Sequence, residues 1–466
     1  MSWNRKKYNR KKHEECVQAI FDDLSSLDVS ELFVRVDQII SDSNSENCQP
    51  EYIAELSVLT PKIYEYDQKT ILRYEPKRKD TNTAISIKNY RPFFVLVTIR
   101  ISEKDLFKFK KLKNKWLKAE FHRKPEDDDY PANLILLSGT RPRPIIDKRN
   151  IKISNGTCSF NGNDINDLTK TDYNVNQFNN CLVTTKNIIA ELSYAWSNKG
   201  YKFIDIYNVG HGNADYIVCH DNKRILYDIG APYKVYSLKS YPKAKQAFSQ
   251  LKPNLVIISH WDADHYMGCG YASDDVFDVT WIAPQLVKGR DNSINLFRLA
   301  AYLMATDKLM LVDIKNAGKL VASSGTKDNA IKLLMGSCTA PETQNITKKN
   351  REGLYIELGE KDDKISVLAG DVSYNSMDSS IFSKPLAFLH VPHHCSKMNT
   401  TRLQNSMWGE EAVISTNFND PLGDPDVDAF HQKELIRKFN NIHYTSEQKG
   451  SLRSIQLHKG GQVKKQ

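Results

Sequence analysis

Short apolar runs dominate the second half of this chain, and polar residues or glycines follow most of them. Their length and their content of β-branched and aromatic residues predict strands. The apolar runs lie at 203–207, 215–219, 225–228, 255–259, 354–358, 365–369 and 386–391.

The first half has a mixed pattern. Apolar positions recur at helical spacing over 13–41, whereas 86–101 and 133–139, rich in β-branched, aromatic and other apolar residues, predict strands. The Asn- and Asp-rich stretch 154–180 predicts a long polar connection, and a helix is expected at about 184–197.

These patterns divide the chain near residue 198. An N-terminal α+β domain is expected at 1–197 and a second domain at 198–466. A length of 466 residues with a 40% hydrophobic share is sufficient for two cores.

One predicted helix, at 102–121, combines an apolar face with a row of lysines. Phe109, Leu112 and Trp116 share one face. The row of lysines on another face could contact the phosphates of a nucleic acid. The alternative is an ordinary amphipathic surface helix, which explains the same pattern. The members of the row are Lys104, Lys108, Lys111, Lys115 and Lys118.

The ends of the predicted strands carry candidate metal ligands. The run HWDADH follows LVIIS, Asp371 follows VLAG, and a pair of histidines follows HVP. Carboxylates and imidazoles at rigid strand ends suit one or two divalent metals. The candidates are His260, Asp262, Asp264, His265, Asp371, His393 and His394.

Two further residues have milder interpretations. Asp228 ends the run RILYD and could orient a ligand through a hydrogen bond, although an Asp close to a Gly is also ordinary turn chemistry. His390 lies inside an apolar run and is more typical of a packed, hydrogen-bonded histidine than of a ligand.

Five stretches in order resemble the metallo-β-lactamase fold, and among its subtypes the soluble domain of the ComEC competence proteins. They are YNVGHGNADYIV, LYDIG, SHWDADHYMG, VLAGD and HVPHHCS, with a looser match at HYTSEQKGSLRSIQL. The resemblance implies an α/β fold, an αββα sandwich with its ligands at one edge, and a metal-dependent hydrolase.

The chain also departs from that family's pattern. Asp262 replaces the second histidine of HxHxDH, as in the ComEC subtype, which favours manganese or magnesium over zinc. No histidine lies between His265 and His390, so one ligand is missing. His211, Asn350 or waters could compensate, and a single-metal site is the alternative.

Three smaller departures concern the surrounding loops. Asn213 stands where the subtype has an acid, Asp424 where it often has a histidine, and Cys395 where a glycine is usual after the paired histidines.

The resemblance also implies roles for these residues. His260, Asp262, Asp264, His265, Asp371 and His393 would bind one or two ions, with manganese favoured and zinc or magnesium as alternatives. Asp371 would bridge two ions, Asp264 would also orient the attacking water, and His394 would contact the leaving group or the scissile phosphate.

Charge and composition indicate the kind of binding partner and the redox state of the cysteines. A net charge of +9 favours anionic partners. The basic start, with Arg5, Lys6, Lys7, Arg10, Lys11 and Lys12, reads as a solvated leader in preference to a nucleic-acid arm. Eight scattered cysteines without a CxxC pair indicate reduced thiols.

No apolar run approaches the roughly 18 residues needed to span a bilayer, and the basic start lacks the apolar segment of a secretory signal. We therefore expect a cytoplasmic protein without the membrane part of the ComEC proteins.

The favoured function is a phosphodiesterase or nuclease that cleaves DNA through a metal-activated water. A hydrolase of small esters, thioesters or cyclic nucleotides keeps the same site with another substrate. In a third hypothesis the site is degenerate, and the chain is a binding or regulatory subunit, for instance in bacterial defence, whose N-terminal domain docks a protein partner.

Overall fold

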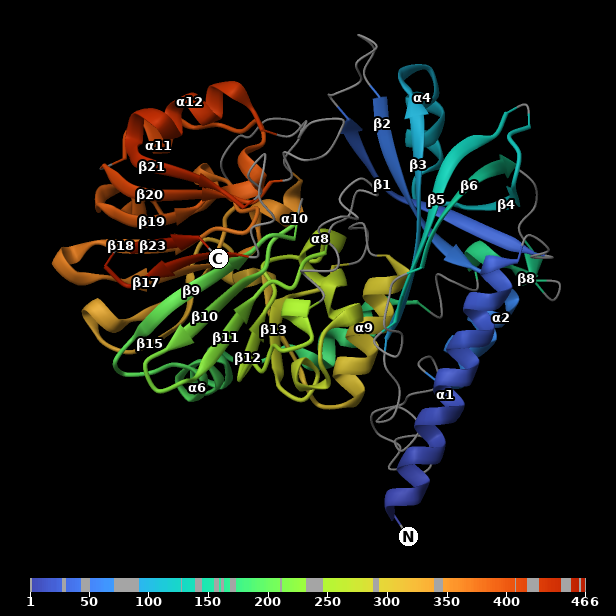
Figure 1. Ribbon diagram of the computed structural model, residues 1–466, viewed down its shortest axis with the longest axis horizontal. Helices are drawn as coiled ribbons and strands as arrows, with labels where there is room; N and C mark the ends of the chain where they lie inside the picture. Colours follow the sequence, from blue (N-terminus) through green and yellow to red (C-terminus); the bar gives the residue numbers. More distant parts are fainter. Residues whose placement is uncertain are drawn as a thin grey trace. The chain divides into compact units, whose positions relative to one another are not determined.

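The computed structural model is a mixed α/β protein of two compact units (Figure 1). It describes residues 2–26, 31–42, 51–70, 92–126, 128–138, 145–154, 159–160, 163–167, 173–209, 212–231, 246–287, 293–338, 347–406, 408–416, 427–445, 454–460 and 462–465. None of the helices in these ranges is long and apolar enough to cross a membrane.

The division of the chain differs from the expected boundary near 198. Unit 1 comprises residues 1–178 together with 286–307, and unit 2 comprises 179–285 together with 308–466. Helix α6 (Thr185–Ala195) therefore belongs to the second unit, and helix α9 (Ile294–Ala305) belongs to the first.

Unit 1 is built on a closed antiparallel barrel with the strand order β1-β2-β3-β5-β6-β4. Closure pairs every strand on both sides and leaves no exposed sheet edge. Its strands are β1 (Leu32–Asp42), β2 (Glu51–Leu59), β3 (Phe93–Ser102), β4 (Trp116–His122), β5 (Tyr130–Ser138) and β6 (Ile145–Ser154).

Besides α9, three helices in the described part of unit 1 precede the barrel strands or lie between them in the sequence. They are α1 (Ser2–Ser25), α2 (Pro61–Thr70) and α4 (Glu103–Leu112), and a short hairpin of β7 (Ser159–Phe160) and β8 (Asn163–Asp164) follows the barrel. The predicted strands at 86–101 and 133–139 correspond to β3 and β5.

Two predictions for unit 1 were wrong. The helical prediction over 13–41 holds only as far as Ser25, because the Val- and Ile-rich residues 32–42 form strand β1. The predicted helix at 102–121 ends at Leu112, and the chain turns at Asn114, whose φ is 63°, into strand β4.

The single lysine face therefore does not exist. Lys104, Lys108 and Lys111 are exposed on α4, and Lys115 is exposed beyond the helix. Lys118 is half-buried in β4, where it pairs with Phe33 and Ser154. The basic start of the chain falls within α1, and its side chains lie outside the described part of the structure.

Helix α9 is held in unit 1 by polar groups that the sequence places far away. The amide of Asn295 pairs with the backbone of Val95, with N···O distances of 3.0 and 2.9 Å. The guanidinium of Arg298 donates to both carboxylate oxygens of Asp67 at 2.9–3.1 Å, and both residues are fully buried.

Unit 2 contains two large sheets. The first has eight strands in the order β14-β13-β12-β11-β10-β9-β22-β23. Their bounds are β9 (Tyr201–Tyr207), β10 (Asp215–Cys219), β11 (Arg224–Tyr227), β12 (Leu255–Ile257), β13 (Thr280–Pro284), β14 (Leu309–Val312), β22 (Ser454–His458) and β23 (Gln462–Lys465).

The second sheet has seven strands in the order β15-β16-β17-β18-β19-β20-β21. They are β15 (Leu320–Ser324), β16 (Ile331–Met335), β17 (Leu354–Gly359), β18 (Ile365–Leu368), β19 (Leu386–His390), β20 (Gly409–Ile414) and β21 (Phe439–Tyr444). The strands predicted in this half of the chain are confirmed.

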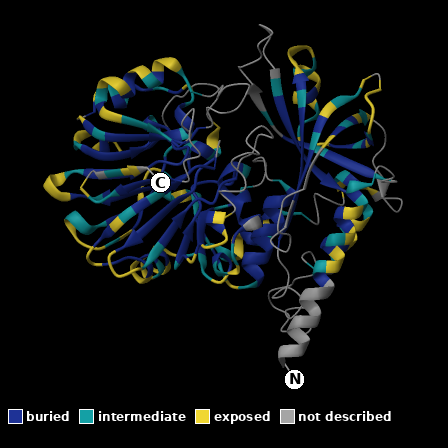
Figure 2. Ribbon diagram, in the orientation of Figure 1, coloured by how far each residue is buried: buried dark blue, intermediate teal, exposed yellow. Residues whose placement is uncertain are grey.

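One apolar core joins the two sheets. Ile217 and Ile257 of the first sheet share a buried cluster with Leu333, Ile356 and Leu368 of the second. A second cluster covers the other face of the seven-stranded sheet and includes Leu403 of α11 (Thr401–Gln404) and Leu435 of α12 (Ala429–Lys438). Most residues of the central strands are accordingly buried, and exposed residues lie mainly on helices, loops and outer strands (Figure 2).

We expect Asp67→Ala to lower the free energy of unfolding by about 3–5 kcal/mol, because it leaves the Arg298 guanidinium buried without its partner. Urea denaturation followed by circular dichroism measures the loss. Lys62→Ala is the control, since its ion pair with Asp23 involves a side chain that is 59% exposed, and should cost about 0–1 kcal/mol. Equal losses in the two variants would contradict the assignment.

Candidate metal centre

The candidate ligands gather where parallel strands end together. β11 and β12 run parallel, as do β18, β19 and β20. The carboxyl ends of parallel strands meet at one edge of a sheet, where side chains that follow them converge. Asp228 follows β11, His260 follows β12, Asp371 follows β18 and Ser415 follows β20.

The loop that carries HWDADH is fastened to the loop after β11. The N–H groups of Ile229 and Gly268 donate to His265 O and Ile229 O, both at 2.9 Å. Gly230 must be glycine, because a Cβ there would lie 1.9 Å from the carbonyl oxygen of Asp264. These backbone hydrogen bonds bring Asp228 next to His265 of the short helix α8 (Ala263–Tyr266).

Asp228 orients His265. Its carboxylate accepts from Ser259 N at 2.7 Å, from Ser259 Oγ at 2.8 Å and from His265 Nδ1 at 2.8 Å. With its proton on Nδ1, the ring directs the Nε2 lone pair to the opposite side. The proposed orienting role of Asp228 is consistent with this geometry.

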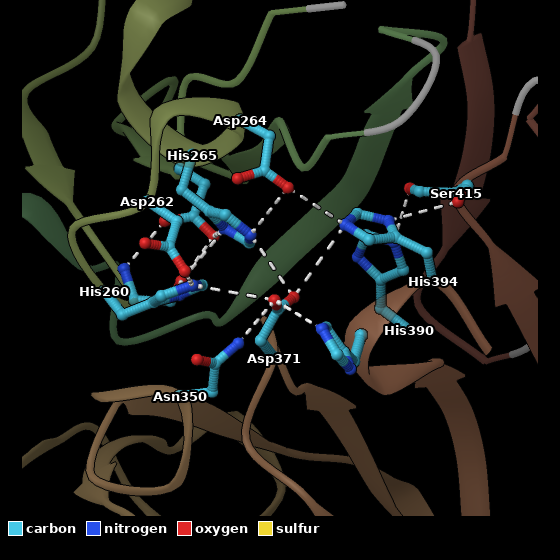
Figure 3. Close-up of polar contacts among 12 residues, drawn as sticks. His260, Asp262, Asp264, His265, Asn350, Asp371, His390, His394 and Ser415 are labelled. Atoms are coloured by element: carbon cyan, nitrogen blue, oxygen red, sulfur yellow. Dashed lines mark hydrogen bonds and ion pairs between the residues drawn. The ribbon is translucent and has the colours of Figure 1, made fainter. Parts of the chain in front are cut away.

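The Nε2 atom of His265 faces carboxylates. It lies 3.2 Å from Asp371 Oδ1 and 3.7 Å from Asp264 Oδ2 (Figure 3). His265 Nε2 and Asp371 Oδ1 are buried and have no hydrogen bond within the described part of the chain. A lone pair directed at carboxylate oxygens is unfavourable, and either a proton on Nε2 or a cation between the atoms removes the repulsion; imidazole and carboxylate donors at this spacing fit a metal ion.

The ionisation of these groups reflects the same crowding. Burial alone would lower the pKa of the His265 imidazole, but the carboxylates of Asp371, Asp264 and Asp228 raise it well above its usual range. Burial would raise the pKa of Asp371, and His265, His393 and His260 hold it well below its usual range.

His394 enters the centre from the second sheet. Its Nδ1 lies 3.2 Å from the carbonyl oxygen of Ser415, and its Nε2 lies 3.5 Å from Asp264 Oδ2. The hydroxyl of Ser415 is 2.7 Å from His390 Nε2, and His390 Nδ1 is 2.8 Å from Asp215 Oδ2. His390 is therefore the hydrogen-bonded core histidine that the sequence predicted.

Two overlapping groups of side chains could hold an ion. His260, His265 and Asp371 form one, and Asp264, His265 and His394 form the other; within each, the ligand atoms lie within 4.8 Å of one another. Mixed imidazole and carboxylate ligands suit zinc, manganese or iron. The identity of the metal stays a prediction.

The paired histidines lie differently in the structure, and which of them binds an ion stays a prediction. His394 is buried and joins Asp264 and His265, whereas the His393 side chain is 19% exposed and lies 3.6 Å from Asp371 Oδ2. The cause is a turn at Pro392–Cys395 in which three successive residues have positive φ: His393 (50°), His394 (55°) and Cys395 (66°). Glycine adopts such a positive φ most easily, and here the position is taken by Cys395, whose side chain lies in the apolar core.

Asp262 and Asn350 have other partners. Asp262 Oδ2 lies 3.1 Å from His260 Nε2, and Oδ1 forms an ion pair with Lys349. Asn350 donates through Nδ2 to Asp371 Oδ2 at 3.0 Å, and its Oδ1 is bonded to the hydroxyl of Thr347. Asn350 thus orients Asp371, while its oxygen is directed away from it. His211 and Asp424 lie outside the described residues.

Lys349 was not predicted from the sequence. It lies on the short helix α10 (Lys348–Arg351) directly before β17. The run KKNREG resembles an ordinary basic turn, and only the tertiary structure brings it to Asp262. The signal in the sequence is indirect: the run precedes a buried strand in the interval where a histidine ligand is missing.

Comparison with known proteins adds little to this geometry. No family model matches the chain, and no curated protein does. Among solved structures, a long form of RNase Z from yeast is similar at 11% sequence identity with a TM-score of 0.24. The match covers 55% of this chain and 40% of the RNase Z chain. A likeness at this level carries no argument about fold or activity.

We expect Asp228→Asn to weaken divalent metal binding about 10–100-fold, because the amide cannot accept from Ser259 and His265 in the same way. Isothermal titration with Mn²⁺ and Zn²⁺ measures the change. Asp307→Asn is a matched control, since Asp307 has the same left-handed φ of 57° and is exposed. Equal dissociation constants for wild type and Asp228→Asn would refute the orienting role.

Proposed function

We propose that this chain is a metal-dependent hydrolase of the metallo-β-lactamase fold, of the ComEC-like subtype, that cleaves phosphodiester bonds in nucleic acid, DNA in particular. The observation that carries this proposal is the convergence of His265 Nε2, Asp371 Oδ1 and Asp264 Oδ2, where both oxygens lie within 3.7 Å of the nitrogen and one divalent ion could contact all three atoms. When bound, a divalent ion would supply positive charge for the phosphate oxygens and activate a water.

The residues of the centre then divide by exposure. His260, His265 and His394 are each at most 1% exposed, so they are suited to build the interior of the centre around an ion. The Asp264 and His393 side chains, 12% and 19% exposed, are those that a substrate can approach. We assign Asp264 to metal binding and to orienting the attacking water, and His393 in place of His394 to contact with the substrate.

The choice of a nucleic acid rests on charge and on the resemblance to the ComEC subtype. The net charge of +9 attracts polyanions and makes binding dependent on salt. Exposed lysines of unit 1 are suited to phosphate contacts, namely Lys104, Lys108, Lys111 and Lys115. Lys118 is half-buried within a strand and is withdrawn from this set.

We expect metal-stripped protein to cleave labelled single- or double-stranded DNA only after Mn²⁺, Mg²⁺ or Zn²⁺ is restored. Asp264→Ala should reduce the rate about 100- to 1,000-fold or more, the order associated with loss of one group that stabilises the transition state. Asp278→Ala removes an exposed acid from the same unit and should leave the rate unchanged.

Other outcomes select the alternatives. Turnover of bis(p-nitrophenyl) phosphate without DNA binding would replace DNA with a small ester or cyclic nucleotide. Absence of turnover with every ion and both substrates would refute the hydrolase and favour a binding or regulatory subunit.

A further inference from the structure

The first metal position of the centre contains a fixed positive charge. Lys349 forms an ion pair with Asp262 Oδ1, and the two side chains are only 11% and 7% exposed. The other oxygen of Asp262 lies 3.1 Å from His260 Nε2. The ammonium therefore lies among the residues that would ligate a first ion in a dinuclear centre.

The second position shares His265 with the first and adds Asp264 and His394, while His260 Nε2 lies 3.6 Å from Asp371 Oδ2 at the first. Asp264 Oδ2 lies 3.7 Å from His265 Nε2 and 3.5 Å from His394 Nε2, and Asp371 Oδ1 lies 3.2 Å from His265 Nε2. The Lys349 ammonium is held by Asp262, which contributes no atom to the group of Asp264, His265 and His394. One ion can be held there while the ammonium stays in place.

Charge repulsion opposes a second divalent ion beside the ammonium. Three carboxylates face ligand atoms or the ammonium, namely Asp262, Asp264 and Asp371, and a fourth, Asp228, is buried against His265. One divalent ion and the ammonium leave one negative charge, whereas two divalent ions and the ammonium leave one positive charge. Ions of a dinuclear centre lie about 3.5–4 Å apart, and at such distances inside a protein an uncompensated like charge is strongly unfavourable.

The missing ligand fits the same interpretation. The sequence between His265 and His390 contains no histidine. The segment in that interval that reaches the centre instead brings Lys349 to Asp262 and Asn350 to Asp371. Lys349 and Asn350 both supply hydrogen-bond donors to these carboxylates. A metal ligand must instead supply a lone pair, so these two donors stabilise the carboxylates in place of an ion and do not bind one.

We propose that the Lys349 ammonium takes the place of the first metal ion, so that the centre binds a single divalent ion through Asp264, His265, His394 and Asp371. His260 and Asp262 then hold the lysine in position. This inference rests on the proposed metal-dependent function, which it makes more specific: a phosphate in the centre would meet one ion and one ammonium.

The test is the number of ions bound per chain. Protein stripped of metal, equilibrated with excess Mn²⁺ and freed of unbound ion should contain about one ion by inductively coupled plasma mass spectrometry, with the spectrum of an isolated Mn²⁺ in electron paramagnetic resonance. Lys349→His, which restores an imidazole, should raise the ratio to about two and produce exchange coupling. Lys349→Arg retains the charge and should stay at about one.

Lys348→His is the matched control, because Lys348 is the preceding residue of the same helix and its side chain is 61% exposed. It should stay at one ion. Two exchange-coupled ions in the wild type would overturn the inference, as would a folded Lys349→His that stays at one. If Lys349→His does not fold, the wild-type and Lys349→Arg ratios decide.

The ratio is independent of turnover. One ion without DNA cleavage would refute the nuclease and support the role of Lys349. Cleavage with two ions would do the reverse.

Discussion

The hydrogen bond between Asp228 and Nδ1 of His265 is the constraint on which the centre depends. It places the proton of the imidazole on the side away from Asp371, so that the Nε2 lone pair enters the centre. The same carboxylate is fixed by two donors of Ser259, at the end of the neighbouring parallel strand. The tautomer of one candidate ligand is thus set by the pairing of β11 with β12, and the apolar core that supports those strands helps to position the candidate centre.

A second network performs the same task from the seven-stranded sheet. The carboxylate of Asp215, at the start of β10, bonds His390, whose other nitrogen holds the hydroxyl of Ser415. The carbonyl of Ser415 in turn lies at the Nδ1 of His394. Asp215 belongs to the first sheet and His390 to the second, so this chain of contacts fixes the distance between the two groups of ligands as well as the orientation of His394.

Most of unit 2 and the content of its centre could be predicted from the sequence. A continuous apolar run followed by Asp or His identifies both a buried strand and the residue after it, so Asp228, His260 and Asp371 were correctly expected to follow strands, and Asp264 and His265 lie on the short helix that follows His260. Features decided by tertiary contacts were not accessible. The left-handed turn at Pro392–Cys395 selects between adjacent histidines, and the position of Lys349 follows from how a short helix meets Asp262.

Unit 1 shows the limits of pattern more clearly. Residues 32–42 and 116–122 alternate too weakly to separate strand from helix, and the closed barrel, in which β1 pairs with β2 and β4, decides the matter. The sequence also could not predict that α9, which lies between the two segments of unit 2, belongs to unit 1. Nothing in the residues around Arg298 indicates that its partner is Asp67. A fully buried guanidinium requires an acid, and Asp67 meets that need from 231 residues away. Because residues 286–307 complete the core of unit 1, the N-terminal 178 residues do not contain a whole domain. A cut at residue 198 would separate Arg298 from Asp67 and leave each charge buried without the other.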